Sequence, residues 1–132
     1  MPDMNVPLHV LIVDDDPDIL LITELALQLS GGWVVKSAAS RAEAVAMLAD
    51  RSTVDVVLAD VSMPGGGGLA LMREVHERDP MRNMPVVLFT ASVRQHDVDR
   101  FLAAGAHGVI GKPFDPLTLG NELRRILAGR EA

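Results

Sequence analysis

Five polar side chains, each placed at the end of a short apolar run, could do chemistry together. They are Asp14, Asp15, Asp60, Thr90 and Lys112. Three carboxylates brought close together repel one another, and a hard divalent cation such as Mg²⁺ relieves that repulsion while keeping water and phosphate oxygens as further ligands. A hydroxyl and an ammonium group beside such a cation are typical of sites that handle a phosphoryl group. The residue types therefore suggest a Mg²⁺ site acting on phosphate, if the fold brings the five together.

The residues in front of these five have the pattern of buried strands. Three short runs are nearly continuous and rich in branched apolar residues, which is typical of parallel strands covered on both faces. These runs span residues 9–13, 54–59 and 85–89. Residues 33–37 and 107–111 are weaker strand candidates, the second because it is rich in glycine.

Helical stretches follow the strands, and capping residues mark where several of them begin and end. The helices are expected from Asp16-Pro17 to Gly31-Gly32, after the Ser40–Glu43 capping box, over residues 68–78 and 93–104, and from Asp115-Pro116, with Leu117, Leu119, Leu123, Ile126 and Leu127 facing inward.

Strand and helix alternating five times predict an α/β fold, a five-stranded parallel sheet flanked by five helices in a flavodoxin-like, doubly wound arrangement. In the strand order 2-1-3-4-5, the first and third strands are neighbours about 4.8 Å apart. Ligands of such sheets bind outside the carboxyl ends of the strands, where the strand order reverses. That crevice is where the five polar residues would meet.

Composition and charge exclude several classes of function. The 132 residues, 48% hydrophobic and 23% charged, are typical of one globular domain over residues 1–132. The chain has no cysteine, which excludes disulfides and zinc–thiolate sites. A net charge of −6 argues against direct binding to nucleic acid. The longest apolar run, over 44–49, is far short of the ~20 residues of a membrane span, and with no visible signal peptide we expect a cytoplasmic protein.

Each of the five residues also has a purely structural explanation. Asp14 and Asp15 precede a helix and could be only capping residues. Asp60 could be only a turn former after a buried strand, and Thr90 alone indicates nothing. Lys112 carries more information, because most of the twelve basic residues are arginine and a lysine supplies a compact charge instead of a planar fork. The functional interpretation depends on all five lying at strand ends.

Four short motifs give the chain a specific resemblance that covers about residues 8–127. They are V-D-D-D-P at 13–17, L-A-D-V-S-M-P-G at 58–65, F-T-A at 89–91 and G-K-P-F at 111–114. In order and spacing the chain resembles the receiver domain of two-component response regulators, and among them the single-domain, chemotaxis-regulator-like type.

The resemblance implies a signalling protein, not an enzyme, and a role for each site residue. Asp60 would accept a phosphoryl group from a sensor histidine kinase or a histidine phosphotransfer protein, and the change would control an output protein or domain. Mg²⁺, or Mn²⁺ in its place, would be held by Asp15, Asp60 and the backbone carbonyl of Ser62, with Asp14 bound through water. The phosphoryl group would be contacted by Lys112, Thr90 and the small Ala91.

Two positions depart from the family pattern. Val109 stands where the family has a tyrosine or phenylalanine three residues before the lysine, so the usual aromatic switch is missing. Gly67 stands where an acidic residue is common, within the run Gly65 to Gly68. Either the region of the fourth helix then shifts by backbone rearrangement, or another face such as this loop carries the signal. The glycine run favours the loop, because it can reorganise at low steric cost.

Three other interpretations of the sequence stand beside the phosphoacceptor. An aspartate-nucleophile phosphatase needs a second aspartate two residues after the first, where this chain has Ser62. A flavin or nucleotide binder of the same fold needs a phosphate-binding loop after the first strand, where the aspartates repel phosphate. The chain could also be a receiver excised from a multidomain regulator or hybrid kinase, which changes its context but not its chemistry.

Overall fold

The computed structural model describes residues 6–49, 53–78 and 83–129. Five strands alternate with five helices. The strands are β1 (Leu8–Val13), β2 (Trp33–Ala38), β3 (Val56–Asp60), β4 (Val86–Thr90) and β5 (Gly108–Gly111). The helices are α1 (Pro17–Ser30), α2 (Arg41–Ala49), α3 (Gly67–His76), α4 (Gln95–Ala103) and α5 (Leu119–Gly129).

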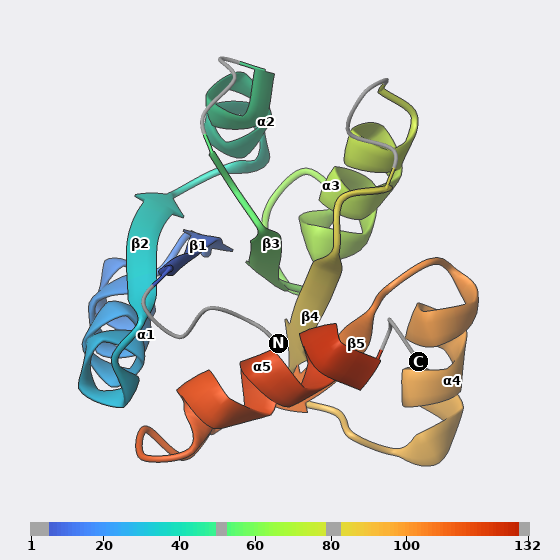
Figure 1. Ribbon diagram of the computed structural model, residues 1–132. Coiled ribbons are helices and arrows are strands. Elements are labelled where there is room, and N and C mark those ends of the chain that lie inside the picture. Colours follow the sequence, from blue (N-terminus) through green and yellow to red (C-terminus); the bar gives the residue numbers. More distant parts are fainter. Residues whose placement is uncertain (1–5, 50–52, 79–82, 130–132) are drawn as a thin grey trace.

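All strand pairs are parallel, and the sheet order is β2-β1-β3-β4-β5, as predicted. The sheet separates two layers of helices (Figure 1). Side chains of α1 and α5 pack on one face, and those of α2, α3 and α4 pack on the other. Every residue of β3 and β4 is buried, because helices cover the central strands on both sides. Within the described ranges, no helix has the length and apolar character that a membrane crossing needs.

Capping residues begin and end helices as the sequence predicts. The Asp16 side chain accepts a hydrogen bond from the backbone N–H of Asp18 at 2.9 Å, at the start of α1. The Ser40 hydroxyl accepts one from the backbone N–H of Glu43 at 3.1 Å, at the start of α2. The helix α1 ends at Gly31, whose φ of 77° suits a residue without a side chain.

The start of α5 differs from the prediction. Asp115 accepts hydrogen bonds from the N–H groups of Leu117, Thr118 and Leu119, and these close a separate turn before the helix begins. Leu117 lies in this turn and is 78% exposed, so the prediction that it faces inward was wrong. Leu119 is fully buried, as predicted.

The second half of the glycine run after β3 is packed more tightly than its composition suggests. A side chain on Gly67 would lie 1.7 Å from the carbonyl oxygen of Val61, and one on Gly68 would lie 2.8 Å from that of Asp60. Both glycines are buried in the first turn of α3. They allow the helix to approach the end of β3 closely, and the expected mobility of the loop stays a prediction.

Candidate functional site

The carboxyl ends of neighbouring strands carry the predicted residues. Asp14 and Asp15 follow β1, Asp60 ends β3, Thr90 ends β4 and Lys112 directly follows β5. Because β2 lies on one side of β1 and β3 on the other, the strand order reverses beside β1. This is the place where parallel α/β sheets bind ligands.

The three carboxylates form one cluster with an open side. Oxygen atoms of Asp14, Asp15 and Asp60 all lie within 4.8 Å of one another. Asp14 and Asp60 are only 3% and 7% exposed, whereas Asp15 is exposed to solvent. Like charges this close, partly removed from water, are unfavourable without a positive partner.

Lys112 supplies a positive partner to both buried carboxylates. Its Nζ lies 3.1 Å from Oδ2 of Asp14 and 3.1 Å from Oδ2 of Asp60. Burial alone would lower the pKa of Lys112, but the hydrogen bonds to Asp14 and Asp60 outweigh burial and raise this pKa. Burial raises the pKa of Asp14 despite the hydrogen bonds from Asp16 and Lys112. The ammonium group is therefore firmly charged, and it is shared by two acids.

Backbone turns fix which carboxylate oxygens face the crevice. Oδ1 of Asp14 accepts a hydrogen bond from the N–H of Asp16 at 2.9 Å. Oδ1 of Asp60 accepts one from the N–H of Ser62 at 3.1 Å. In both residues one oxygen is held by the following turn, which leaves Oδ2 directed at Lys112.

Thr90 is buried at the end of β4, and its hydroxyl has a different partner. Oγ1 of Thr90 accepts a hydrogen bond from the backbone N–H of Ser92 at 3.0 Å. The carbonyl of Thr90 accepts another from the N–H of Lys112 at 2.8 Å, which ties the ends of β4 and β5 together. The hydroxyl proton of Thr90 is not used by the bond from Ser92, and it is free to be donated elsewhere.

Comparison with known proteins identifies the family to which this arrangement of residues belongs. Residues 10–124 match the family described as the response regulator receiver domain. The chain belongs to this family. The chain is 38% identical over 107 residues to the DNA-binding transcriptional regulator NtrC of Escherichia coli K12, covering 79% of this chain and 21% of NtrC. It is 31% identical over 120 residues to the response regulator SaeR of Staphylococcus epidermidis, covering 91% of this chain and 50% of SaeR.

Solved receiver structures have the same fold. The structure of the chemotaxis response regulator CheY4 of Vibrio cholerae superimposes with a TM-score of 0.82 at 31% identity, covering 92% of this chain and 99% of CheY4. The strand order predicted from the sequence is therefore that of a receiver domain. The chain spans about a fifth of NtrC and half of SaeR.

The acidic cluster of this receiver has the donor set that a hard divalent cation requires. All the side-chain atoms that it offers as ligands are carboxylate oxygens, and Mg²⁺ prefers oxygen ligands over nitrogen and sulfur. Asp15 lies on the exposed side, where bound water can complete a coordination shell. The cluster fits such an ion by its chemistry.

The remaining predicted positions surround the cluster or lie on β5. Ser62 lies two residues after the end of β3, Ala91 directly follows the end of β4, and both are exposed. Val109 lies in β5 opposite Leu88 in the strand register, and it is half-buried against the apolar layer on the α4 side of the sheet. The residue that replaces the usual aromatic at this position is therefore a small side chain that is already partly packed.

Two features of the receiver were missed by sequence reasoning. The rings of Phe89 and Phe114 stack with centroids 5.4 Å apart, and Lys112 Nζ lies 5.7 Å from the centroid of Phe89. Both phenylalanines stand inside the motifs F-T-A and G-K-P-F, so their pairing could have been predicted from strand order. The hydroxyl of Ser92 donates to Oδ2 of Asp97 at 2.5 Å. No sequence motif signalled that contact.

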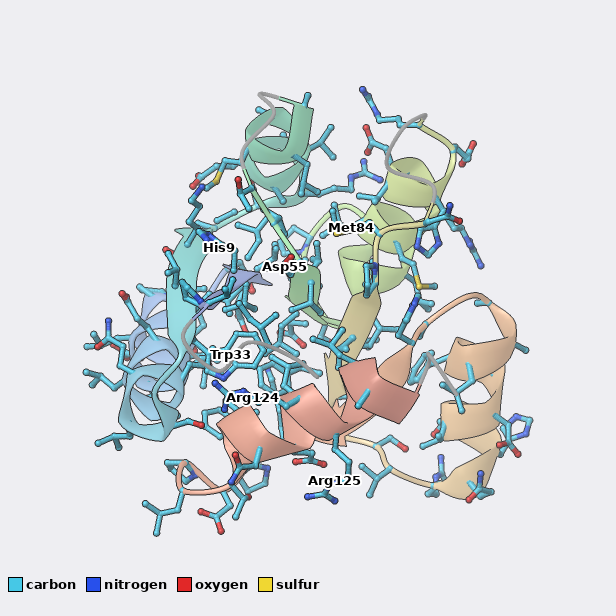
Figure 2. All side chains as sticks on the ribbon, viewed as in Figure 1. His9, Trp33, Asp55, Met84, Arg124 and Arg125 are labelled. Carbon is cyan, nitrogen blue, oxygen red and sulfur yellow. The ribbon has the colours of Figure 1, made fainter. Side chains whose placement is uncertain are left out.

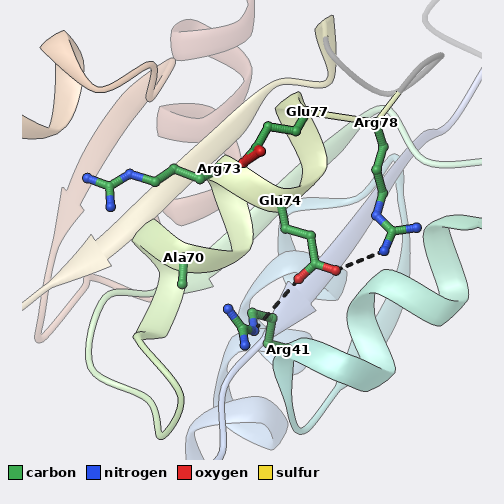
Figure 3. A pocket seen from close by; sticks show the side chains of 6 residues that line it. All are labelled: Arg41, Ala70, Arg73, Glu74, Glu77 and Arg78. Carbon is green, nitrogen blue, oxygen red and sulfur yellow. Dashed lines mark hydrogen bonds and ion pairs between the residues drawn. The ribbon is translucent and has the colours of Figure 1, made fainter.

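A shallow pocket on another surface is unrelated to this site. Figure 3 shows it between α2 and α3, with Glu74 placed between Arg41 and Arg78 at 3.8 and 3.0 Å. Its lining residues include none of the strand-end carboxylates. Of its charged groups, Glu74 is paired with Arg41 and Arg78, and surface pairs of this kind contribute little to stability.

Proposed function

We propose that this receiver is a Mg²⁺-dependent phosphoacceptor in two-component signal transduction. Asp60 takes a phosphoryl group from a phosphohistidine of a sensor histidine kinase or a histidine phosphotransfer protein. The observation that supports this most strongly is the placement of Asp60, which is buried, has carboxylate oxygens of Asp14 and Asp15 within 4.8 Å, and lies 3.1 Å from the Lys112 ammonium. An acid used only to close a turn would need neither neighbour.

The transfer follows from this placement. An oxygen of Asp60 attacks phosphorus, an O–P bond forms, the N–P bond to the donor histidine breaks, and the electron pair returns to the imidazole nitrogen. Lys112 moves its charge from the carboxylates to a phosphoryl oxygen, because its Nζ already lies between Asp14 and Asp60. Thr90 donates its free hydroxyl proton to another phosphoryl oxygen, and Ala91 leaves space beside it.

The acidic cluster would hold the metal during transfer. Mg²⁺, or Mn²⁺ in its place, bound by Asp15, Asp60 and the Ser62 carbonyl and through water by Asp14, would neutralise negative charge on the transferring group. Asp60 would then serve both as ligand and as nucleophile. Lys112 remains the one protein cation placed at the two buried carboxylates among the described residues.

The unit proposed for this role is a single receiver domain over residues 1–132, and its proposed location is the cytoplasm. It has no catalytic role beyond promoting its own phosphorylation and dephosphorylation. Because the chain spans only part of NtrC and SaeR, its output is either a separate protein or a domain of a larger regulator or hybrid kinase. The phosphatase alternative is not favoured, because the position it needs is occupied by Ser62.

Calorimetric titration with beryllofluoride, a mimic of the phosphoryl group, tests the proposal. With Mg²⁺ present we expect binding by the wild type and none by Asp60→Ala. Asp55→Ala is the matched control, since Asp55 adjoins the other end of β3, where its side chain accepts a hydrogen bond from the His9 N–H at 2.7 Å. The control should bind like the wild type. Equal binding by Asp60→Ala and wild type would contradict the phosphoacceptor role.

A further inference from the structure

We propose that Ser92 and Asp97 couple the phosphoryl site to helix α4. The hydrogen bond between their side chains transmits a change at the Thr90 hydroxyl into the first turn of the helix. This inference rests on the proposed function, because it takes Thr90 as a contact of the phosphoryl group.

Ser92 donates two hydrogen bonds, one toward the phosphoryl site and one toward α4. Its backbone N–H donates to Oγ1 of Thr90 at 3.0 Å, and its hydroxyl donates to Oδ2 of Asp97 at 2.5 Å. Thr90 ends β4, and Asp97 lies in the first turn of α4. Two hydrogen bonds therefore connect the buried threonine to the helix through one residue.

Asp97 is held firmly at the helix end of the link. Its side chain is only 17% exposed, and Arg94 and Arg100 lie 3.7 and 4.0 Å from its oxygens. The hydrogen bond from Ser92 is the main reason that the pKa of Asp97 is lowered. The acceptor is thus a charged carboxylate, and hydrogen bonds to charged acceptors are stronger than neutral ones.

Helix α4 otherwise begins without a side-chain cap. Arg94 occupies the N-cap position, and its side chain makes no capping hydrogen bond. The contact from Ser92 to Asp97 fastens the first turn to the loop after β4. A displacement of Ser92 would therefore move the first turn of α4.

A side-chain switch at Val109 and the glycine-rich loop that the sequence favours are both less suited to this task. Val109 has one side-chain torsion and is half-buried, so it cannot swing between two positions as a large aromatic ring could. Gly67 and Gly68, at the start of α3, are held close to the carbonyls of Val61 and Asp60. The bonded path through Ser92 begins at Thr90 itself.

The coupling follows from what the Thr90 hydroxyl must do. Donating to a phosphoryl oxygen requires the hydroxyl to turn toward Asp60, and Oγ1 is at the same time the acceptor for Ser92. A shift of that acceptor strains or moves the Ser92 N–H, and the Ser92 hydroxyl passes the movement to Asp97. The phosphoryl group would thereby favour one position of α4 over another, because it contacts Thr90 differently in the two conformations.

Backbone amide chemical shifts test this, measured before and after beryllofluoride is added to the Mg²⁺-bound protein. We expect the wild type to change at Asp60, Lys112 and residues 95–103. In Ser92→Ala and Asp97→Ala the changes at Asp60 and Lys112 should persist, while those in 95–103 are lost. A purely structural role for the two residues would not separate these groups of signals.

Two conservative controls sharpen the test. Ser92→Thr keeps the hydroxyl and should restore the response of α4. Asp99→Ala removes an equal charge from the same helix and should respond like the wild type, because the Asp99 side chain accepts a hydrogen bond from the exposed Gln95 at 2.6 Å and none from Ser92. Undiminished changes over 95–103 in both Ser92→Ala and Asp97→Ala would overturn the coupling alone. Failure of the wild type to bind beryllofluoride would overturn the proposed function, and the coupling with it.

Discussion

At the residue scale, the three carboxylates of the site differ in how their charge is balanced. Asp14 and Asp60 are buried and share the ammonium group of Lys112, whereas Asp15 is exposed and forms no ion pair with the residues that the structure describes. Asp15 therefore adds repulsion to the cluster without relief from a cation of the protein. In the absence of metal, removing different charges from this cluster should have opposite effects on stability.

We predict that Asp15→Asn raises and Lys112→Met lowers the free energy of unfolding in EDTA. The first change removes repulsion of up to about 1 kcal/mol. The second leaves two buried carboxylates without their cation and should cost about 2 kcal/mol. Urea denaturation of both variants measures the difference, and added Mg²⁺ should stabilise Asp15→Asn less than wild type. A destabilised Asp15→Asn in EDTA would show that Asp15 is a structural cap.

The strand-end residues could be predicted from sequence because each follows directly on a recognisable run. Strand order alone then brings them together, and no side-chain detail is needed. The contact of Ser92 with Asp97 could not be predicted in the same way. It depends on the path of the loop between β4 and α4 and on the start of α4 at Gln95, two residues later than the sequence suggests.

At the scale of elements, α1, β2 and α5 are joined by one arginine. Arg124 of α5 donates to Ser30 Oγ at 3.2 Å and to the carbonyl of Gly31, where α1 ends. Its guanidinium carbon also lies 5.0 Å from the ring centroid of Trp33. Figure 2 places Arg124 beside Trp33, while Arg125 extends away from it. A cation at the C-terminus of α1 is favourable for the helix dipole.

We predict that Arg124→Met lowers the free energy of unfolding by roughly 1 to 2 kcal/mol, because it removes two hydrogen bonds and a cation–π contact. Arg125→Met is the matched control, since Arg125 is the next residue of the same helix and is exposed. It should change stability by less than about 0.5 kcal/mol. Equal losses in the two variants, measured by urea denaturation, would contradict the role given to Arg124.

The sequence predicts where α1 begins and ends better than it predicts which of its residues are buried. Its apolar residues form a face so broad that the pattern alone cannot tell which part is covered. In the structure Ala26 and Leu27 are buried, while Leu21, Leu25 and Leu29 are 56%, 51% and 71% exposed. Which of these residues are buried is determined by packing against β1, β2 and α5. The sequence of the helix alone does not contain this information.

At the scale of the whole molecule, the chemistry and the single tryptophan lie at opposite ends of the sheet. Trp33 begins β2 and pairs with Leu8, the first residue of β1, whereas the carboxylates follow the last residues of the strands. Trp33 is 8% exposed and lies beneath Arg124. Its surroundings are therefore set by α5 and not by the phosphoryl site.

We predict that Trp33 emission stays unchanged in wavelength and intensity when Mg²⁺ and beryllofluoride bind. Arg124→Met is the positive control, since it removes the cation next to the ring and should alter the emission spectrum. Fluorescence titration, run alongside the calorimetry, measures both. Strong quenching of the wild type by the ligands would contradict the separation between Trp33 and the site.

The most direct test of the central claim is whether Asp60 becomes covalently phosphorylated. Intact-protein mass spectrometry after incubation with Mg²⁺ and a small phosphodonor such as acetyl phosphate measures this. We predict that the wild type gains one phosphoryl group, which hydroxylamine removes as it does from an acyl phosphate. Asp60→Asn, and the wild type in EDTA, should gain none. A wild type that is never modified, or an Asp60→Asn variant modified to the same extent, would contradict the assignment of Asp60 as the phosphoacceptor.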